Sequence, residues 1–397
     1  MKSIFVTILC FIIVNVAIAS DAIIWQQELS CDSNSEYRPG AMVVDSISNE
    51  VVIFGTSEQN MDTRKSNLWL WKIDPNGSVK NRKSLGLLSQ YNSFMVGPFG
   101  IKATVKPNTG EIVRLKLDDV NSISLSVTDR NMQSRTAKLG IRWKRSETFL
   151  LHDMTSYQND DLFFVGQENK DGIVMKTDLT GNVVWKKIFN HGQTNILSSV
   201  ARAPDGENFY VAGISVLLSD KAKLPDPLTV CALRYGSSGE LKESNFFQGG
   251  IAPLIGIFPK VICLPSGIVL VVYDNTRIGT APGLCVKAYT PELEPLYEKQ
   301  ILKTKEKTPP TRFDICATEQ NHFVLAANVN IGDLRVYECD ADGTILQTVE
   351  LDREIGAGGV YVDYLAGRIF VAYATKLKEN AKEAKIKLLA LKPYKTN

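Results

Sequence analysis

Two aspartates, Asp45 and Asp363, are the residues whose type and placement most directly suggest chemistry. Each lies a few residues before a tight turn, in the segments DSISNE and DYLAGR, and they fall at what look like equivalent positions of two repeats. If the fold brings the two segments together, a close pair of carboxylates could bind a cation or act as general acid and base. Aspartates before turns also commonly accept hydrogen bonds from backbone amides. Both interpretations stay open at this point.

Aromatic, basic and histidine side chains in the longer connecting segments form a second group of candidates. These connections are longer and more varied than hairpin turns require, which favours recognition of a ligand. Ordinary loop packing is the alternative role for each side chain. The residues that we expect to contact a ligand are Tyr37, Arg38, Tyr91, Phe94 and His191.

Motifs that would announce a catalytic or metal centre are absent from the sequence. No GxSxG elbow, HExxH motif, P-loop or calcium-loop pattern occurs. The chain has only three histidines, and no two cysteines have the spacing of a zinc-binding pair. We therefore expect no metal, no cofactor and no catalytic residues, although residues scattered along a chain can still assemble an active site.

Composition and charge indicate a globular protein. The 397 residues are 44% hydrophobic and 22% charged, which allows a large core. Lysine and arginine (45) nearly balance aspartate and glutamate (43), so the net charge of +2 gives no field that would attract nucleic acid or an anionic membrane. We expect a monomer without a nucleic-acid partner.

The first 20 residues are typical of a secretory signal peptide. Lys2 precedes apolar stretches at 4–6 and 8–14, and Ala17 and Ala19 have the spacing that signal peptidase recognises. A membrane anchor is the alternative, but the apolar run is shorter than the roughly 20 residues that span a bilayer. The sequence therefore predicts a secreted protein with no transmembrane anchor and a single domain over residues 21–397.

In a secreted protein the cysteines could form disulfides and one asparagine could be glycosylated. Cys10 would leave with the signal peptide, and the other six cysteines could form disulfides or remain structural thiols. Pairs between neighbouring repeats, Cys263 with Cys316 or Cys231 with Cys285, are conceivable, whereas buried thiols are the simpler expectation. Asn76-Gly77-Ser78 is the one N-glycosylation sequon after residue 20.

The elements that must position these residues follow a repeat. In DGIVMKTDLTGNVVWKKIFN, residues 171–190, two alternating apolar runs flank a turn in which Asp178 accepts a backbone N–H and Gly181 takes a positive φ. A degraded copy at 123–139 lacks the glycine, and we expect Asn131 to take the left-handed conformation there. The other copies lie at 68–85, 230–247, 284–301 and 334–351, about 53 residues apart on average.

A second pair of short strands is expected ahead of each hairpin, so each unit has four antiparallel strands. Such units, repeated every 40 to 55 residues or so, are typical of a β-propeller. The last unit lacks one strand, and residues 22–30 match residues 182–190, with Trp25 falling on Trp185. We predict an all-β, seven-bladed β-propeller of four-stranded antiparallel blades, closed by the N-terminal strand completing the last blade. Two stacked β-sandwiches, or six or eight blades, are the alternatives.

The segments GIVMKTDLTGNVVWKK and LWLWKIDPNGSV resemble the tandem repeats of secreted propellers in the quinoprotein-like and WD40-like superfamilies, over about residues 22–393. Asp178, Thr180, Gly181 and Trp185 resemble the tryptophan-docking motif of quinoproteins, which implies that Trp185 packs between blades. The adjacent-cysteine pair of quinoprotein dehydrogenases is missing. The resemblance therefore implies a blade architecture without a quinone cofactor.

Three functions fit these patterns. The leading hypothesis is a secreted, non-catalytic propeller that binds a protein or glycan partner through its loop face. The second is an enzyme acting on carbohydrates or lactones through Asp45 and Asp363. The third is sequestration of a small molecule in the axial channel.

Overall fold

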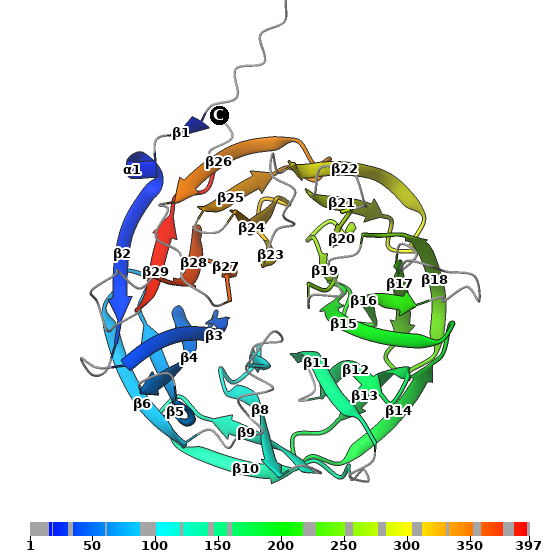
Figure 1. Ribbon diagram of the computed structural model, residues 1–397, viewed down its shortest axis with the longest axis horizontal. Coiled ribbons are helices and arrows are strands. Elements are labelled where there is room, and N and C mark those ends of the chain that lie inside the picture. The colour runs from blue at the N-terminus through cyan, green and yellow to red at the C-terminus, as the bar shows by residue number, and fades with distance from the viewer. Residues whose placement is uncertain are drawn as a thin grey trace, which may run out of the picture.

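The computed structural model is a ring of seven antiparallel sheets around a central axis (Figure 1). The structure describes residues 16–17, 19–30, 35–59, 62–87, 101–119, 122–141, 147–156, 161–216, 228–250, 257–276, 283–303, 312–330, 333–351, 359–375 and 385–394. Within these residues, each sheet contains one four-stranded blade whose strands run in order from the axis outwards, and one of the seven sheets carries a short fifth strand at its outer edge (Figure 1). The predicted seven-bladed propeller is therefore confirmed.

Each blade consists of four consecutive strands except the last, which takes its outer strand from the N-terminus. Blade 1 contains β3 (Ser35–Asp45), β4 (Glu50–Gln59), β5 (Asp62–Ile73) and β6 (Val79–Leu87). Blade 2 contains β7 (Ala103–Val105), β8 (Ile112–Asp119), β9 (Ser122–Thr128) and β10 (Ser134–Lys138). Blade 3 contains β11 (Phe149–Ser156), β12 (Leu162–Glu168), β13 (Asp171–Thr177) and β14 (Val183–Phe189).

The remaining blades follow the same plan. Blade 4 contains β15 (Thr194–Arg202), β16 (Asn208–Val216), β17 (Thr229–Gly236) and β18 (Leu241–Gln248). Blade 5 contains β19 (Lys260–Cys263), β20 (Val269–Asp274), β21 (Gly283–Tyr289) and β22 (Pro295–Lys303). Blade 6 contains β23 (Phe313–Ala317), β24 (Phe323–Asn330), β25 (Asp333–Cys339) and β26 (Ile345–Leu351). Blade 7 contains β27 (Tyr361–Leu365), β28 (Arg368–Ala374), β29 (Ile386–Leu391) and β2 (Ile23–Leu29).

The core is divided among the spaces between blades. Seven apolar clusters of described residues each join two successive blades. The second strands have apolar side chains on both faces; Val52, Ile53 and Phe54, for example, are consecutive and at most 1% exposed. A sheet with two apolar faces must be covered on both sides. Arranging the sheets in a ring meets this requirement for every blade.

The ring is closed by its two chain ends. Strand β2 pairs antiparallel with β29, with Trp25 opposite Ala390 and Gln26 opposite Leu389, and β29 continues the sheet to β28. The backbone N–H of Lys392 also donates to the carbonyl oxygen of Ala22 at 2.9 Å. The predicted closure is confirmed, and it removes the open edge that an incomplete last blade would leave.

Tryptophans on outer strands dock onto the turn of the following blade. Trp25 donates from Nε1 to the carbonyl oxygen of Pro75 at 2.8 Å, and its ring lies so close to Gly77 that a Cβ there would be 2.9 Å away. Trp185 makes the same contact between blades 3 and 4, where its Nε1 donates to the carbonyl oxygen of Ser237 at 3.2 Å. The packing of Trp185 between blades, expected from the resemblance, is therefore present, and Trp25 performs the same role at the closure.

Blade 2 corrects one expectation. In its outer hairpin the residue with a positive φ is Met132, at 66°, and not Asn131. Met132 donates its N–H to the carbonyl oxygen of Asp129 at 3.1 Å, as Gly181 does to Asp178 in blade 3. The Met132 side chain is 6% exposed and packs in the cluster between blades 1 and 2. Its burial compensates for the left-handed backbone.

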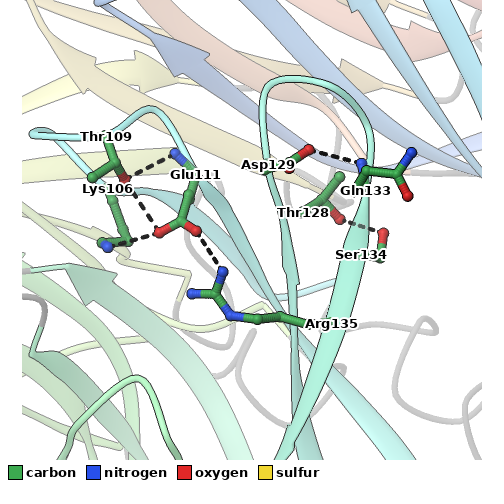
Figure 2. Close-up of polar contacts among 8 residues, drawn as sticks. All are labelled: Lys106, Thr109, Glu111, Thr128, Asp129, Gln133, Ser134 and Arg135. Atoms are coloured by element: carbon green, nitrogen blue, oxygen red, sulfur yellow. Dashed lines mark hydrogen bonds and ion pairs between the residues drawn. The ribbon is translucent and has the colours of Figure 1, made fainter.

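A charged cluster fixes the two hairpins of blade 2 to each other (Figure 2). Glu111, just before β8, accepts from Nζ of Lys106 at 2.8 Å and from Arg135 on β10 at 2.7 Å (Figure 2). Burial alone would raise the pKa of Glu111, but hydrogen bonds from these two cations hold that pKa below its usual value. The cluster therefore stabilises the blade whose sequence is least regular.

The N-terminal residues before β2 lie beside blade 6. Strand β1 (Val16–Ala17) pairs in parallel with Thr348 and Val349 of β26, and the four-residue helix α1 (Ala19–Ala22) follows it. Among the residues that the structure describes, no helix is both long and apolar enough to cross a membrane.

Candidate functional site

A pocket of about 280 Å³ lies on the axis, where the inner strands begin. Residues directly before those strands, such as Lys102, Arg312 and Val360, contribute to its wall. The pocket is therefore on the loop face, where the chain passes from one blade to the next. We call it the axial pocket.

One equivalent residue from every blade lines this pocket. The equivalent residues are found from the strand pairing. In blade 3, Leu162 on the second strand pairs with Thr177, the last residue before the outer turn. Val165, three residues after Leu162, pairs with Asp153 on the inner strand. The same count in each blade gives the set that we call the axial ring. The axial ring consists of Ala41, Lys102, Asp153, Ser199, Lys260, Asp314 and Tyr361.

Three inner strands carry a β-bulge directly before their residue of the axial ring. The extra residues are Gly40, His152 and Ser198, as the register shifts in β3, β11 and β15 show. A bulge rotates the side chains that follow it and is frequent next to binding sites. These bulges therefore help to determine what faces the axial pocket.

Glycines on the second strands make room for the bulges. Gly55, Gly166 and Gly213 each pair with the residue just before a bulge. A Cβ on Gly166 would lie 2.0 Å from the carbonyl oxygen of Leu150, and one on Gly213 would lie 2.4 Å from that of Ile196. These glycines stand in the segments VIFGT, FFVGQ and YVAGI, and a glycine inside an apolar strand pattern indicates a bulge or a close backbone approach.

Polar side chains of the axial ring connect neighbouring blades. The Oδ2 atom of Asp153 accepts from Ser199 Oγ at 3.1 Å and from the N–H of Val200 at 3.0 Å. Ser199 Oγ accepts in turn from the N–H of Val261 at 3.2 Å. Blades 3, 4 and 5 are therefore linked by a chain of hydrogen bonds along the pocket wall.

An ion pair continues this connection. Lys260 Nζ donates to Asp314 Oδ1 at 2.5 Å, and Asp314 Oδ2 accepts from the N–H of Val362 at 3.0 Å. Asp363, two residues beyond Tyr361, accepts from the N–H of Val44 in blade 1. The acidic groups near the axis thus hold blades 5, 6, 7 and 1 together.

The basic groups in the axial pocket lie in a water-poor setting. Lys102 is half-buried in the pocket wall, and burial among protein groups lowers its pKa to about 8. Asp153 and Asp314 oppose the lowering, and the like charge of Lys260 adds to it. Burial lowers the pKa of His152 to about 3, with a further contribution from Lys102, so the imidazole is neutral at pH 7.

Asp45 and Asp363 have different roles in the structure. Asp45 is 1% exposed; Oδ1 accepts from the N–H of Ile47 at 3.0 Å, and Oδ2 accepts from Ser48 Oγ at 2.6 Å. It therefore caps its turn. Asp363 lies two residues before the pair that closes its hairpin, whereas Asp45 belongs to the closing pair. The expectation that they occupy equivalent positions is wrong.

The three loop candidates that the structure describes, Tyr37, Arg38 and His191, do not line the axial pocket. Tyr37 and the half-buried Arg38 belong to β3, which starts at Ser35, and the Tyr37 side chain is 0% exposed against Trp71. His191 is half-buried, with its ring stacked 3.9 Å from that of Phe246. Tyr91 and Phe94 lie outside the described residues. Their contact with a ligand stays a prediction.

The structure also shows where the possible glycosylation site and the described cysteines lie. Asn76 is exposed in the outer turn of blade 1, where its N–H donates to Asp74 Oδ1 at 2.9 Å. All five described cysteines are free thiols, and Cys31 lies outside the described residues. No three His, Cys, Asp or Glu side chains in the described part of the chain gather as metal ligands would.

Comparisons with known proteins identify the fold alone. No protein-family model and no curated protein matches the sequence. A solved structure of the polysaccharide lyase Uly1 is similar, with a TM-score of 0.58 and 10% identity over 94% of this chain and 99% of that one. A structure of BBS1N in complex with ARL6DN has a TM-score of 0.53 and 13% sequence identity, over 95% of this chain and 98% of that one. A puromycin hydrolase structure has a TM-score of 0.54 and 12% sequence identity over 87% of this chain. This chain spans about half, 53%, of the length of that enzyme.

Proposed function

We propose that this chain is a secreted, non-catalytic β-propeller that binds a protein or glycan partner through its loop face, with the axial pocket receiving a polar group of that partner. The observation that carries the proposal is the axial ring. All seven blades contribute to one small pocket, and six of the seven positions of the axial ring hold polar or charged side chains. Concave sites with convergent polar groups are the usual places for ligand recognition.

The hydrogen bonding of the acidic groups favours binding over catalysis. A general acid or base needs a carboxylate that can reach the reacting atoms. Both oxygens of Asp314 accept bonds from neighbouring blades, at 2.5 and 3.0 Å. Asp153 accepts at 2.9 Å from the N–H of Met154 in addition to its bonds to blade 4. The fold itself hosts a hydrolase, a lyase and a partner-binding protein by name, so it gives no preference among them.

Secretion belongs to the proposal and rests on the pattern of residues 1–20. Its test is expression of the whole chain in secretory cells, followed by recovery from the medium with the N-terminus sequenced. We expect the mature protein to begin near residue 21. Retention of the intact chain inside the cells would contradict this part.

Binding at the pocket is tested on protein and glycan arrays with the secreted protein. We expect wild type to bind a restricted set of partners and the double variant Lys102→Glu, Arg312→Glu to lose them. The matched control is Arg82→Glu, since Arg82 is exposed on β6. Binding that survives the double variant would remove the axial pocket from the proposal, and turnover of an array glycan would contradict a non-catalytic role.

A further inference from the structure

The axial pocket is lined by more cationic side chains than carboxylates. Three cations contribute to its wall, Lys102, Lys260 and Arg312, and two carboxylates, Asp153 and Asp314. Lys260 is already paired with Asp314 at 2.5 Å. The oxygens of both carboxylates accept bonds within the ring of blades, so they have little capacity left for a ligand.

Arg312 is the most available of the three cations. It lies directly before β23 and is half-buried at the pocket. Its backbone is fixed, because its carbonyl oxygen accepts from the N–H of Asn328 at 2.9 Å. Its guanidinium makes no hydrogen bond or ion pair to the described residues, although five N–H donors suit it to planar anions.

A bound carboxylate would also stabilise the charged form of Lys102. Two positive groups, Lys102 and Lys260, act on each other in the pocket, and burial disfavours the charged form of Lys102. An anion close to both Lys102 and Arg312 would favour that charged form. The pocket therefore suits a ligand that brings one negative charge.

The size and walls of the pocket favour a sugar as the carrier of this charge. About 280 Å³ is small for a drug-sized ligand or a peptide segment and suits a single ring. Two aromatic residues, Phe258 and Tyr361, line the pocket beside residues whose polar side chains suit sugar hydroxyls. Tyr361 stays a neutral hydroxyl, because burial raises its pKa.

From these observations we propose that the axial pocket recognises the carboxylate of an acidic sugar, a hexuronic acid or a related sugar acid, and that Arg312 and Lys102 hold the carboxylate. This inference deepens the proposed function and rests on it, because it assumes that the axial pocket is the binding site. It gives the partner a chemical class, an acidic glycan.

The test is calorimetric titration of the purified secreted protein with four probes: glucuronate, galacturonate, glucose and N-acetylglutamate. We expect one or both uronates to bind, and glucose to bind at least about tenfold more weakly, since charge-assisted bonds are lost. Arg312→Gln and Lys102→Gln should each weaken uronate binding by about tenfold. Arg82→Gln on the outer strand β6 should leave it unchanged.

Several results would overturn the inference. Equal binding of glucose and the uronates would show that charge is not recognised. Equal binding of N-acetylglutamate and the uronates would favour an acidic peptide over a sugar. Unchanged affinity of Arg312→Gln, with its circular dichroism spectrum like that of wild type, would exclude Arg312. If no uronate binds while array partners are lost in the double variant, this inference fails and the proposed function stands.

Discussion

Lys260 and Asp314 form a 2.5 Å ion pair that joins the inner strands of blades 5 and 6 at the edge of the axial pocket. The two residues occupy the same register position in their blades, so the pair follows the circumference of the ring. Asp314 also accepts from the N–H of Val362 in blade 7 at 3.0 Å. One carboxylate therefore connects three blades.

This connection predicts unequal effects for its two partners. Asp314→Ala should lower the free energy of unfolding by about 1–3 kcal/mol, because it removes the acceptor of a buried backbone N–H as well as the ion pair. Lys260→Met, which leaves the bond from Val362, should cost less than about 1 kcal/mol, since the lysine is half-exposed. Urea denaturation of both variants measures this. A larger cost for Lys260→Met would contradict the assignment.

The closure of the ring gives a second prediction. Trp25→Ala should lower the free energy of unfolding by about 2–4 kcal/mol, somewhat below the cost for a fully buried Trp. It should also expose residues before Leu29 to proteases, because β2 is an outer strand that pairs with β29 on one side, and the docked Trp25 helps to hold it in place. Trp185→Ala removes the same contact inside the ring and is the matched control. We expect a similar stability loss without N-terminal cleavage, and equal cleavage of both variants would argue against a special role for the closure.

The sequence predicted the blades well because each hairpin combines period-two alternation with a turn of specific chemistry. It also predicted the closure, since Trp25 repeats the position of Trp185. The axial ring was not predictable in the same way. Positions near the axis depend on bulges and on turn lengths, and the hairpin after Asp45 has a four-residue turn whereas that after Leu365 has a two-residue turn. Asp45 and Asp363 each lie five residues before the strand that follows the turn, but the unequal turn lengths give them different register positions.

The bulges themselves make a third prediction. Gly166→Ala should lower the free energy of unfolding by more than about 2 kcal/mol, because the new Cβ would lie 2.0 Å from the carbonyl oxygen of Leu150. Gly140→Ala is the control, since the nearest atom to its Cβ would be 3.6 Å away. Thermal unfolding compares the two. A neutral Gly166→Ala would mean that the β11 bulge does not depend on this glycine.

Met132 provides a fourth prediction, because it takes a positive φ that methionine rarely adopts. At a positive φ, glycine is favoured over alanine by about 1 kcal/mol or more. We therefore expect Met132→Gly to be more stable than Met132→Ala, although both lose the buried side chain. At Met154, which is buried in β11 and has no positive φ, the order should reverse. Chemical denaturation of the four variants decides it, and the same order at both sites would refute the explanation.

Asp363 predicts how stability depends on pH. Burial raises its pKa to about 7; the N–H of Tyr364 opposes this, the charge of Asp314 adds to it, and the N–H of Val44 opposes it. Between about pH 4 and 7 the folded protein therefore binds more protons at this site than the unfolded chain, whose aspartates titrate near 3.9. The stability that protonated Asp363 provides is fully present below about pH 4 and is lost as pH rises through 7.

Substitution by asparagine isolates this contribution. The free energy of unfolding of wild type, minus that of Asp363→Asn, should fall as pH rises from 4 to 7 and then level off. His152 acts in the opposite direction, because its depressed pKa lowers stability as pH falls below about 6.5, but it contributes equally to both proteins and cancels in the difference. Urea titrations at pH 4, 5.5, 7 and 8 provide the measurement. A difference that rises with pH would show that Asp363 is ionised in the folded protein and is stabilised by Val44 and Tyr364.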